Sequence, residues 1–217
     1  MDTVVLADVD GTLVDSNYHH AVAWFRAFRE VGVTVPIWRI HRAIGMGGDQ
    51  LVEAVAGERV ELVHGDDVRA AWAEQVKPLL GEIVPLTGAR DLLVEVKRLG
   101  CGLVLASSGK PEHVDHYLNL LGARDLADGW TTSEDVDATK PAPDLLGVAL
   151  HKVPAERALA LGDSVWDCEA AGKLGIPTVG LRTGGFGEAE LRDAGAVRVY
   201  EDPSSLRAEL RDVLELV

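Results

Sequence analysis

Two carboxylates separated by one residue follow a short apolar run near the start of the chain. Residues 4–7 are apolar without polar alternation, which is typical of a strand buried on both faces of a parallel sheet. Asp8 and Asp10 come directly after this run, at a spacing that places both side chains on the same side of an extended chain. In open α/β sheets ligands bind beyond the carboxyl ends of the strands, so the two acids are candidates for catalysis.

The same stretch is compatible with a plainer structure. Asp10-Gly11 is a strong two-residue hairpin signal, with residues 4–9 and 12–14 as the two arms. A calcium-binding loop would need a third acid at alternate spacing before the glycine, and the sequence lacks it. These residues by themselves therefore leave the hairpin open beside the buried parallel strand.

Further polar residues follow other predicted elements, in a fixed order along the chain. They are Ser107 and Ser108 after an apolar run at 103–106, Lys140 in a Lys-Pro-Ala-Pro loop, and Asp163 and Asp167 after an apolar run at 158–161. Each has an ordinary explanation by itself, since serines and aspartates often cap helices and loop lysines are usually solvated. Four such groups in order, each after or between elements of a parallel sheet, are hard to obtain by chance.

Residues 8–16 (Asp-Val-Asp-Gly-Thr-Leu-Val-Asp-Ser) resemble the first signature of the haloacid-dehalogenase superfamily of phosphohydrolases. The downstream groups resemble the other three signatures, so the resemblance spans nearly the whole chain. Because it carries a second acid, Asp10, the chain resembles the phosphatase and phosphomutase branch of the superfamily. This branch includes phosphoglycolate phosphatases and β-phosphoglucomutases. The dehalogenases that name the superfamily lack this second acid.

The resemblance implies a role for each of four catalytic residues. Asp8 is the expected nucleophile, forming an aspartyl-phosphate that divides one difficult step into two. Asp10 is expected to protonate the leaving oxygen and then to take a proton from water. Ser107 and Lys140 are expected to hold the non-bridging phosphoryl oxygens, and the lysine supplies positive charge at the site.

The resemblance also implies a magnesium ion. Magnesium suits an all-oxygen site with few carboxylates and retained waters, and a carboxylate needs a cation to approach a phosphate. The implied ligands are Asp8, the main-chain carbonyl of Asp10, and Asp163. Asp167 is expected to act as a ligand through water or as the partner of Lys140.

Four residues are expected to bind substrate: Ser108, Thr12, His20 and Gly47. Many relatives carry Asn where this chain has Ser108, so we expect altered substrate contacts there. His20 is a substrate-facing candidate, and Gly47 belongs to a glycine-rich turn that predicts a hinge or a substrate loop. Trp24, four residues after His20, is expected to lie in the hydrophobic core rather than to contact substrate.

The elements that must position these residues follow an α/β pattern. Helical patterns without a convincing strand cover residues 18–32, 36–44, 49–56 and 66–80. The strands expected after them lie at residues 103–106, 130–132, 158–161, 177–181 and 197–200, with helices between them. We therefore predict a Rossmann-like parallel sheet core, residues 1–15 and 82–217, with an inserted all-helical cap domain, residues 16–81.

Composition limits the partners and the compartment. The 217 residues carry a formal net charge of −14, which argues against nucleic acid and against an anionic membrane as partners. Neither an apolar run of about 20 residues nor a signal peptide is visible. The two cysteines show no metal spacing or disulfide framework, so we expect a cytoplasmic protein, monomer or homodimer. Exposed Trp38 and Trp72 would mark a contact surface.

The resulting functional hypothesis is a magnesium-dependent phosphatase. Its substrate would be a small phosphorylated metabolite of the phosphoglycolate or sugar phosphate type. A β-phosphoglucomutase-like phosphomutase, which would pass the phosphoryl group from Asp8 to a sugar hydroxyl, is one alternative. A phospho-ligand-binding regulator without turnover is the other, and it predicts missing catalytic residues.

Overall fold

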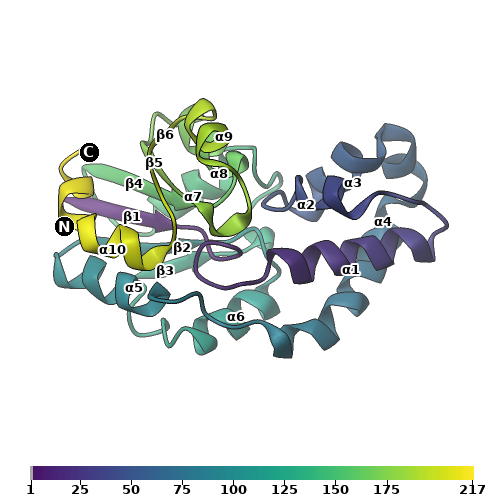
Figure 1. Cartoon of the computed structure of the whole chain (residues 1–217), viewed down its shortest axis with the longest axis horizontal. Helices are drawn as coiled ribbons and strands as arrows, with labels where there is room; N and C mark the ends of the chain where they lie inside the picture. Colours follow the sequence, from purple (N-terminus) through teal and green to yellow (C-terminus); the bar gives the residue numbers. More distant parts are fainter. Residues whose placement is uncertain (1) are drawn as a thin grey trace.

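A six-stranded parallel sheet forms the centre of the larger part of the molecule (Figure 1). The computed structural model describes residues 2–217. The sheet order is β3-β2-β1-β4-β5-β6, the doubly wound Rossmann order. The strands are β1 (Thr3–Ala7), β2 (Gly102–Ala106), β3 (Gly129–Thr131), β4 (Arg157–Gly162), β5 (Thr178–Leu181) and β6 (Ala196–Tyr200). The predicted fold class is confirmed.

Helices cover both faces of this sheet, because the side chains of each strand alternate between two hydrophobic clusters. From β1, Val5 packs in one cluster and Val4 in the other. The Val5 cluster includes residues of α5 (Ala89–Arg98), α6 (Pro111–Leu120) and α10 (Pro203–Leu214). The Val4 cluster includes residues of α7 (Asp144–Leu150) and α8 (Val165–Lys173), and α9 (Glu188–Asp193) packs against β5 and β6. The central strand β1 is thus buried on both faces.

The strand order changes direction between β1 and β4. It adds β2 and β3 on one side of β1 and then returns to add β4 on the other, so the carboxyl ends of β1 and β4 border the crevice where such sheets bind ligands. Ala7 pairs with Leu161, which sets Asp8 and Asp163 side by side just beyond the two strands. Since β1 pairs in parallel with β2 and β4, the hairpin alternative for residues 4–14 is wrong.

A helical segment lies between β1 and α5 and forms the second lobe, on the right in Figure 1. Its elements are α1 (Asn17–Glu30), α2 (Ile37–His41), α3 (Gly48–Ala56), α4 (Glu58–Val76) and the 3₁₀ helix η1 (Lys77–Glu82). These elements bury their own apolar cluster, built around Trp24, Phe28 and Trp72. The expected cap is therefore present as a compact unit. Trp38 is exposed on α2, whereas Trp72 is buried and offers no outer contact surface.

The helix expected at residues 66–80 begins eight residues earlier, at Glu58. Gly57, with a φ of 87°, separates it from α3, and Gly65 is accommodated inside the helix. The first turn carries Glu58 and Glu61, which favour the positive end of the helix dipole. Packing of α4 against α1 and α3 thus outweighs the local cost of an interior glycine, about 1 kcal/mol.

Polar contacts near α2 and α3 are among those that hold the cap to the core. From α2, His41 Nε2 lies 2.9 Å from the carbonyl of Gly184, and Arg42 donates to Glu190 at 2.5 Å. Near α3, Thr139 donates to Asp49 through its hydroxyl at 2.5 Å and its main-chain N–H at 3.1 Å. The second contact joins the cap to the residue that precedes Lys140.

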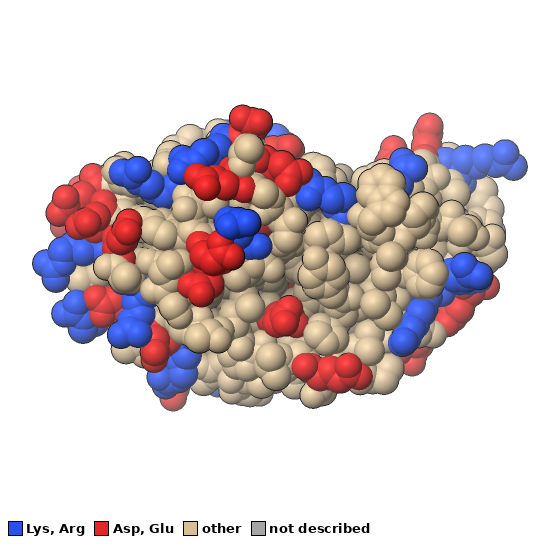
Figure 2. Space-filling model, viewed as in Figure 1, with Lys and Arg blue, Asp and Glu red and all other residues tan. Residues whose placement is uncertain are grey.

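Charged side chains of both signs are interspersed over the face shown in Figure 2, where the junction between the two lobes is mostly uncharged. That face has no large basic patch of the kind that nucleic-acid binding requires. No helix within residues 2–217 is long and apolar enough to cross a membrane.

The turn after β1 is crowded around Gly11. Its φ is 76°, and a Cβ at this position would collide with the Asn17 amide and the Asp163 carboxylate. Gly32 has nearly the same φ, 75°, but open space around it. We expect Gly32→Ala to cost about 1–2 kcal/mol of unfolding free energy for the backbone conformation alone, and Gly11→Ala to cost clearly more. Urea unfolding of both variants measures the difference, and equal costs would contradict the crowded turn.

Candidate active site

Asp8 lies at the centre of a buried cluster of charges. It follows the last residue of β1, and its main-chain N–H donates to the carbonyl of Leu161 at 2.9 Å. Its side chain accepts a hydrogen bond from Lys140 and a longer one, 3.3 Å, from the Thr12 hydroxyl. Burial raises the pKa of Asp8 against the attraction of Lys140, and the neighbouring Asp167 carboxylate adds to the rise.

Lys140 is almost completely enclosed, with 1% of its surface exposed. Its ammonium donates to Asp8 and, at 2.7 Å, to Asp167. Burial disfavours the ammonium, but Asp167 and Asp8 outweigh it and raise the pKa of Lys140. Lys140 is therefore a fixed positive charge facing the end of β1, and not the solvated loop lysine that its Lys-Pro context would ordinarily suggest.

Asp167 is fixed from its other side by the start of α8. Its Oδ2 accepts the hydroxyl of Ser164 at 2.6 Å and the main-chain N–H of Ser164 at 3.1 Å. The Ser164 hydroxyl in turn accepts the N–H of Asp167, which completes a capping box. The capping box uses only Oδ2 of Asp167, so Oδ1 accepts the hydrogen bond from Lys140.

Asp163 is oriented by two donors from the segment that leads into the cap. Thr12 donates to Oδ1 at 2.7 Å and Asn17 donates to Oδ2 at 2.8 Å. Burial and the neighbouring Asp167 carboxylate raise the pKa of Asp163 to about 7 against these hydrogen bonds. Asn17 was not anticipated from the sequence, because an asparagine at a helix start looks like a cap.

Asp8, Asp163 and Asp167 are suited to hold a divalent cation. One carboxylate oxygen from each lies within 4.8 Å of the others, and all three side chains are buried. Three buried carboxylates share one ammonium, so the cluster is short of positive charge, and the raised pKa values of Asp8 and Asp163 express that deficit. An all-oxygen set of this kind fits magnesium.

The Asp10 side chain turns away from this cluster toward the cap. Its Oδ1 accepts the Ser16 hydroxyl at 2.6 Å and lies 3.0 Å from His20 Nε2. Burial would raise the pKa of Asp10, but the charge of His20 and hydrogen bonds from His20 and Ser16 lower it to about 2. His20 Nε2 is also 3.2 Å from the Tyr117 hydroxyl. A carboxylate and a histidine are therefore in hydrogen-bond contact at the cavity wall.

The two serines after β2 have different surroundings. Ser107 is completely buried, and its hydroxyl accepts the N–H of Gly109 at 3.0 Å. Ser108 is partly exposed and lines the cavity above the carboxylates, together with Gly109. Ser108 thus faces the space that a bound molecule would fill, while Ser107 lies beneath it.

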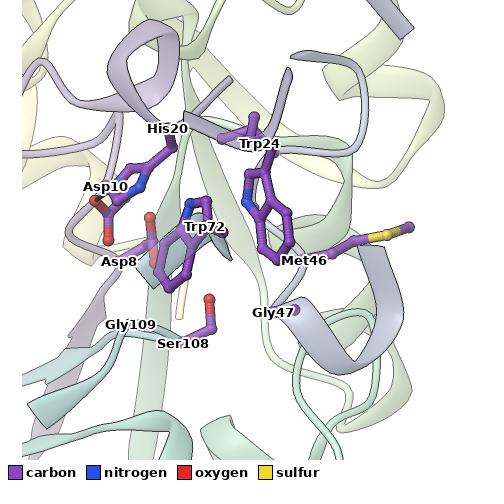
Figure 3. Close-up of a pocket in the computed structure, with 12 residues that line it drawn as sticks. Asp8, Asp10, His20, Trp24, Met46, Gly47, Trp72, Ser108 and Gly109 are labelled. Carbon is purple, nitrogen blue, oxygen red and sulfur yellow. Dashed lines mark hydrogen bonds and ion pairs between the residues drawn. The ribbon is translucent and has the colours of Figure 1, made fainter. Parts of the chain in front are cut away.

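A small cavity of about 60 Å³ connects these groups, and its walls come from both lobes (Figure 3). Asp8, Asp10 and Ser108 belong to the core, and His20, Trp24 and Trp72 to the cap. Figure 3 shows the His20 ring beside Asp10 and the two indoles beside one another. Trp24 packs in the cap core as expected and also borders the cavity. Trp72 also packs in the cap core and borders the cavity. The sequence shows only that it belongs to a helical apolar pattern, and this pattern does not predict a place at the cavity.

Two of the expected substrate-binding residues have other contacts. Thr12 is completely buried, and its hydroxyl donates to Asp163 and, at a longer distance, to Asp8. Its expected contact with substrate stays a prediction. Gly47 does line the cavity, but its N–H donates to the Thr139 hydroxyl at 3.0 Å. Gly47 thereby contributes to the contact between cap and core.

Comparison with known proteins agrees with the fold. A crystal structure of a hydrolase from Pseudomonas syringae is 33% identical with a TM-score of 0.92, covering 98% of this chain and 99% of that one. A validoxylamine A 7′-phosphate phosphatase from Streptomyces hygroscopicus subsp. limoneus is 28% identical over 84% of this chain and 87% of its own length. A phosphoglycolate phosphatase from Colwellia psychrerythraea is 29% identical over 85% and 87%.

A family model described as haloacid dehalogenase-like hydrolase matches residues 3–175, which include every carboxylate of the cluster and Lys140. The resemblance seen in the sequence is thereby confirmed, and the chain belongs to the haloacid dehalogenase-like hydrolases.

Proposed function

We propose that this protein is a magnesium-dependent phosphatase that hydrolyses a small phosphate monoester through an aspartyl-phosphate on Asp8. The observation that carries this proposal is the position of Asp8, held by Lys140 beside Asp163 and Asp167 at the base of a cavity. The similarity to two proteins named as phosphatases of small phosphorylated molecules supports the same reaction class. We also propose the cap, residues 16–81, as the part that selects the substrate.

The chemistry of the first step follows from the charges around Asp8. A magnesium ion held by Asp8, Asp163, the main-chain carbonyl of Asp10 and, through water, Asp167 would neutralise phosphoryl charge. A carboxylate oxygen of Asp8 attacks phosphorus, and the bond from phosphorus to the ester oxygen breaks. Lys140, held by Asp167, stabilises the negative charge on the non-bridging oxygens. Ser107 donates its hydroxyl to one of these oxygens.

Asp10 acts as the general acid in the first step and as the general base in the second. In the free protein its pKa of about 2 keeps Asp10 ionised, with His20 Nε2 at 3.0 Å. The negative charge of a bound phosphate raises the pKa of a nearby carboxyl, so Asp10 takes up a proton and donates it to the leaving oxygen. Asp10 then accepts a proton from the water that hydrolyses the aspartyl-phosphate. Such acid–base assistance contributes about 10²–10⁴-fold.

The nucleophile can be tested with two aspartates from the same segment. We expect Asp8→Asn to abolish turnover and phosphoenzyme formation, because an amide is a poor nucleophile for phosphorus. Asp15→Asn is the matched control, since Asp15 is exposed and outside the cluster. Phosphate release with p-nitrophenyl phosphate and acid-quenched mass spectrometry measure both effects. Wild-type hydrolysis by Asp8→Asn would refute the nucleophile, and isomerisation of a hexose 1-phosphate with little hydrolysis would favour a phosphomutase.

The metal site can be tested with two buried threonines. We expect EDTA to remove activity and Mg²⁺ to restore it. Thr12→Val removes the donor that orients Asp163 and should raise the Mg²⁺ concentration for half-activation by about 10–100-fold. Thr131→Val is the control, because the Thr131 hydroxyl is buried without a partner within residues 2–217. The shift of the unfolding temperature with Mg²⁺ gives a second readout, and equal behaviour of the two variants would contradict the ligand assignment of Asp163.

A further inference from the structure

A second and larger cavity continues outward from the first. Its volume is about 220 Å³, and the two cavities share Trp24, Gly48, Trp72 and Ser108. Together they approach about 300 Å³, the lower end of the range for small-molecule sites. A phosphoryl group bound at Asp8 would direct the rest of the molecule into this second cavity. The residues that line the second cavity therefore indicate the chemical class of the leaving group. This inference rests on the proposed function.

The second cavity has an aromatic wall formed by two tryptophans of the cap. The Trp24 and Trp72 rings are stacked, with centroids 4.9 Å apart and planes 15° from parallel (Figure 3). Trp72 is 9% exposed, and its indole N–H has no partner within residues 2–217. This N–H is itself buried, so the ring faces and edges, and not the donor, form the wall. The remaining polar wall includes the hydroxyls of Ser108 and Ser133.

Of the two cations that line this cavity, Arg69 is already engaged by carboxylates. Both terminal nitrogens of Arg69 are occupied: Nη2 donates to Glu61 at 2.8 Å and to Asp66 at 2.9 Å, and Nη1 donates again to Glu61 at 3.0 Å. Lys110 makes no ion pair within the part of the chain that is described, and its Nζ lies 5.9 Å from the centre of a Trp72 ring.

The acids of the same cavity offset what cationic charge remains. Asp49 is engaged by Thr139, and Asp137 is an exposed carboxylate on the wall opposite the cap. Two acids thus line the cavity beside two cations, one of which is already neutralised by other carboxylates. A second phosphate or carboxylate would find no net positive charge here, whereas Ser and Asp groups suit neutral hydroxyls.

We propose that the second cavity is the subsite for an uncharged, polyhydroxylated ring, so that the substrate is the monophosphate of a sugar or cyclitol. The C–H face of such a ring carries small positive partial charges and packs against the electron-rich face of an indole. Its hydroxyls bind Ser133 and Asp137. A two-carbon acid would leave most of this space unfilled, and the second anion of a bisphosphate would find Lys110 offset by the carboxylates of Asp49 and Asp137.

The test compares kcat/KM for four phosphate esters with wild-type protein and Mg²⁺. Glucose 6-phosphate and myo-inositol 1-phosphate represent ring monophosphates, phosphoglycolate represents a small second anion, and fructose 1,6-bisphosphate represents a second phosphate. We expect kcat/KM for the better ring monophosphate to exceed kcat/KM for phosphoglycolate and for fructose 1,6-bisphosphate by about tenfold or more. A preference for phosphoglycolate or the bisphosphate, or no preference, would overturn the subsite.

Matched variants assign the preference to particular side chains. Trp72→Leu should reduce kcat/KM for the ring ester about tenfold, mainly through KM, while Trp38→Leu, which replaces an exposed tryptophan of the cap, should not. Trp72→Phe, which keeps the aromatic face and loses the N–H, and Ser133→Ala provide readouts should Trp72→Leu fail to fold. If Lys110→Met abolishes turnover of a preferred anionic ester, the cavity is an anion site and the proposal is wrong.

A separate readout distinguishes this inference from the proposed function. Hydrolysis of p-nitrophenyl phosphate without the ring preference would preserve the phosphatase and refute the subsite. If nothing is hydrolysed, calorimetric binding of the same four esters to Asp8→Asn still reports on the cavity. Tighter binding of the ring monophosphates than of phosphoglycolate supports the subsite, and equal or weaker binding refutes it.

Discussion

The interaction on which the site depends is the buried contact of one ammonium with two of three neighbouring carboxylates. Lys140 donates to Asp8 and Asp167, and Asp163 lies within reach of the same space. Removing such charges from water costs several kcal/mol per ion unless partners compensate, and one lysine cannot compensate three acids. The cluster therefore favours a further cation. Within it, Lys140 lowers the pKa of Asp8 against the burial and the neighbouring carboxylates that raise it.

Much of the surrounding structure serves to hold these carboxylates apart at fixed positions. Asp8 is fixed by strand β1 and Asp167 by the capping box of α8, while Asp163 is held by Thr12 and Asn17. Gly11 permits this because a side chain there would occupy the space of Asn17 and the Asp163 carboxylate. Packing against the site itself thus fixes the shape of the turn after β1. The same turn leads directly into the cap.

The cap and the core share the residues that face a bound molecule. Trp24 and Trp72 are part of the hydrophobic cluster of the cap and also walls of both cavities. His20 reaches from α1 to Asp10, and Asp49 reaches from α3 to Thr139, next to Lys140. Cap position and site geometry are therefore coupled, because any displacement of the cap breaks contacts to residues beside the catalytic carboxylates.

The sequence by itself determined the fold class, the family and the identity of the polar groups at the strand ends. Apolar runs without alternation predict buried parallel strands, and Asp8, Asp163 and Lys140 follow or separate them at recognisable positions. Only the tertiary structure decided what each side chain contacts. Thr12 donates to Asp163, Trp72 faces the cavity rather than solvent, and Arg69 is neutralised by Glu61. Local patterns specify burial and element type, whereas the direction of a side chain depends on packing between segments far apart in the chain.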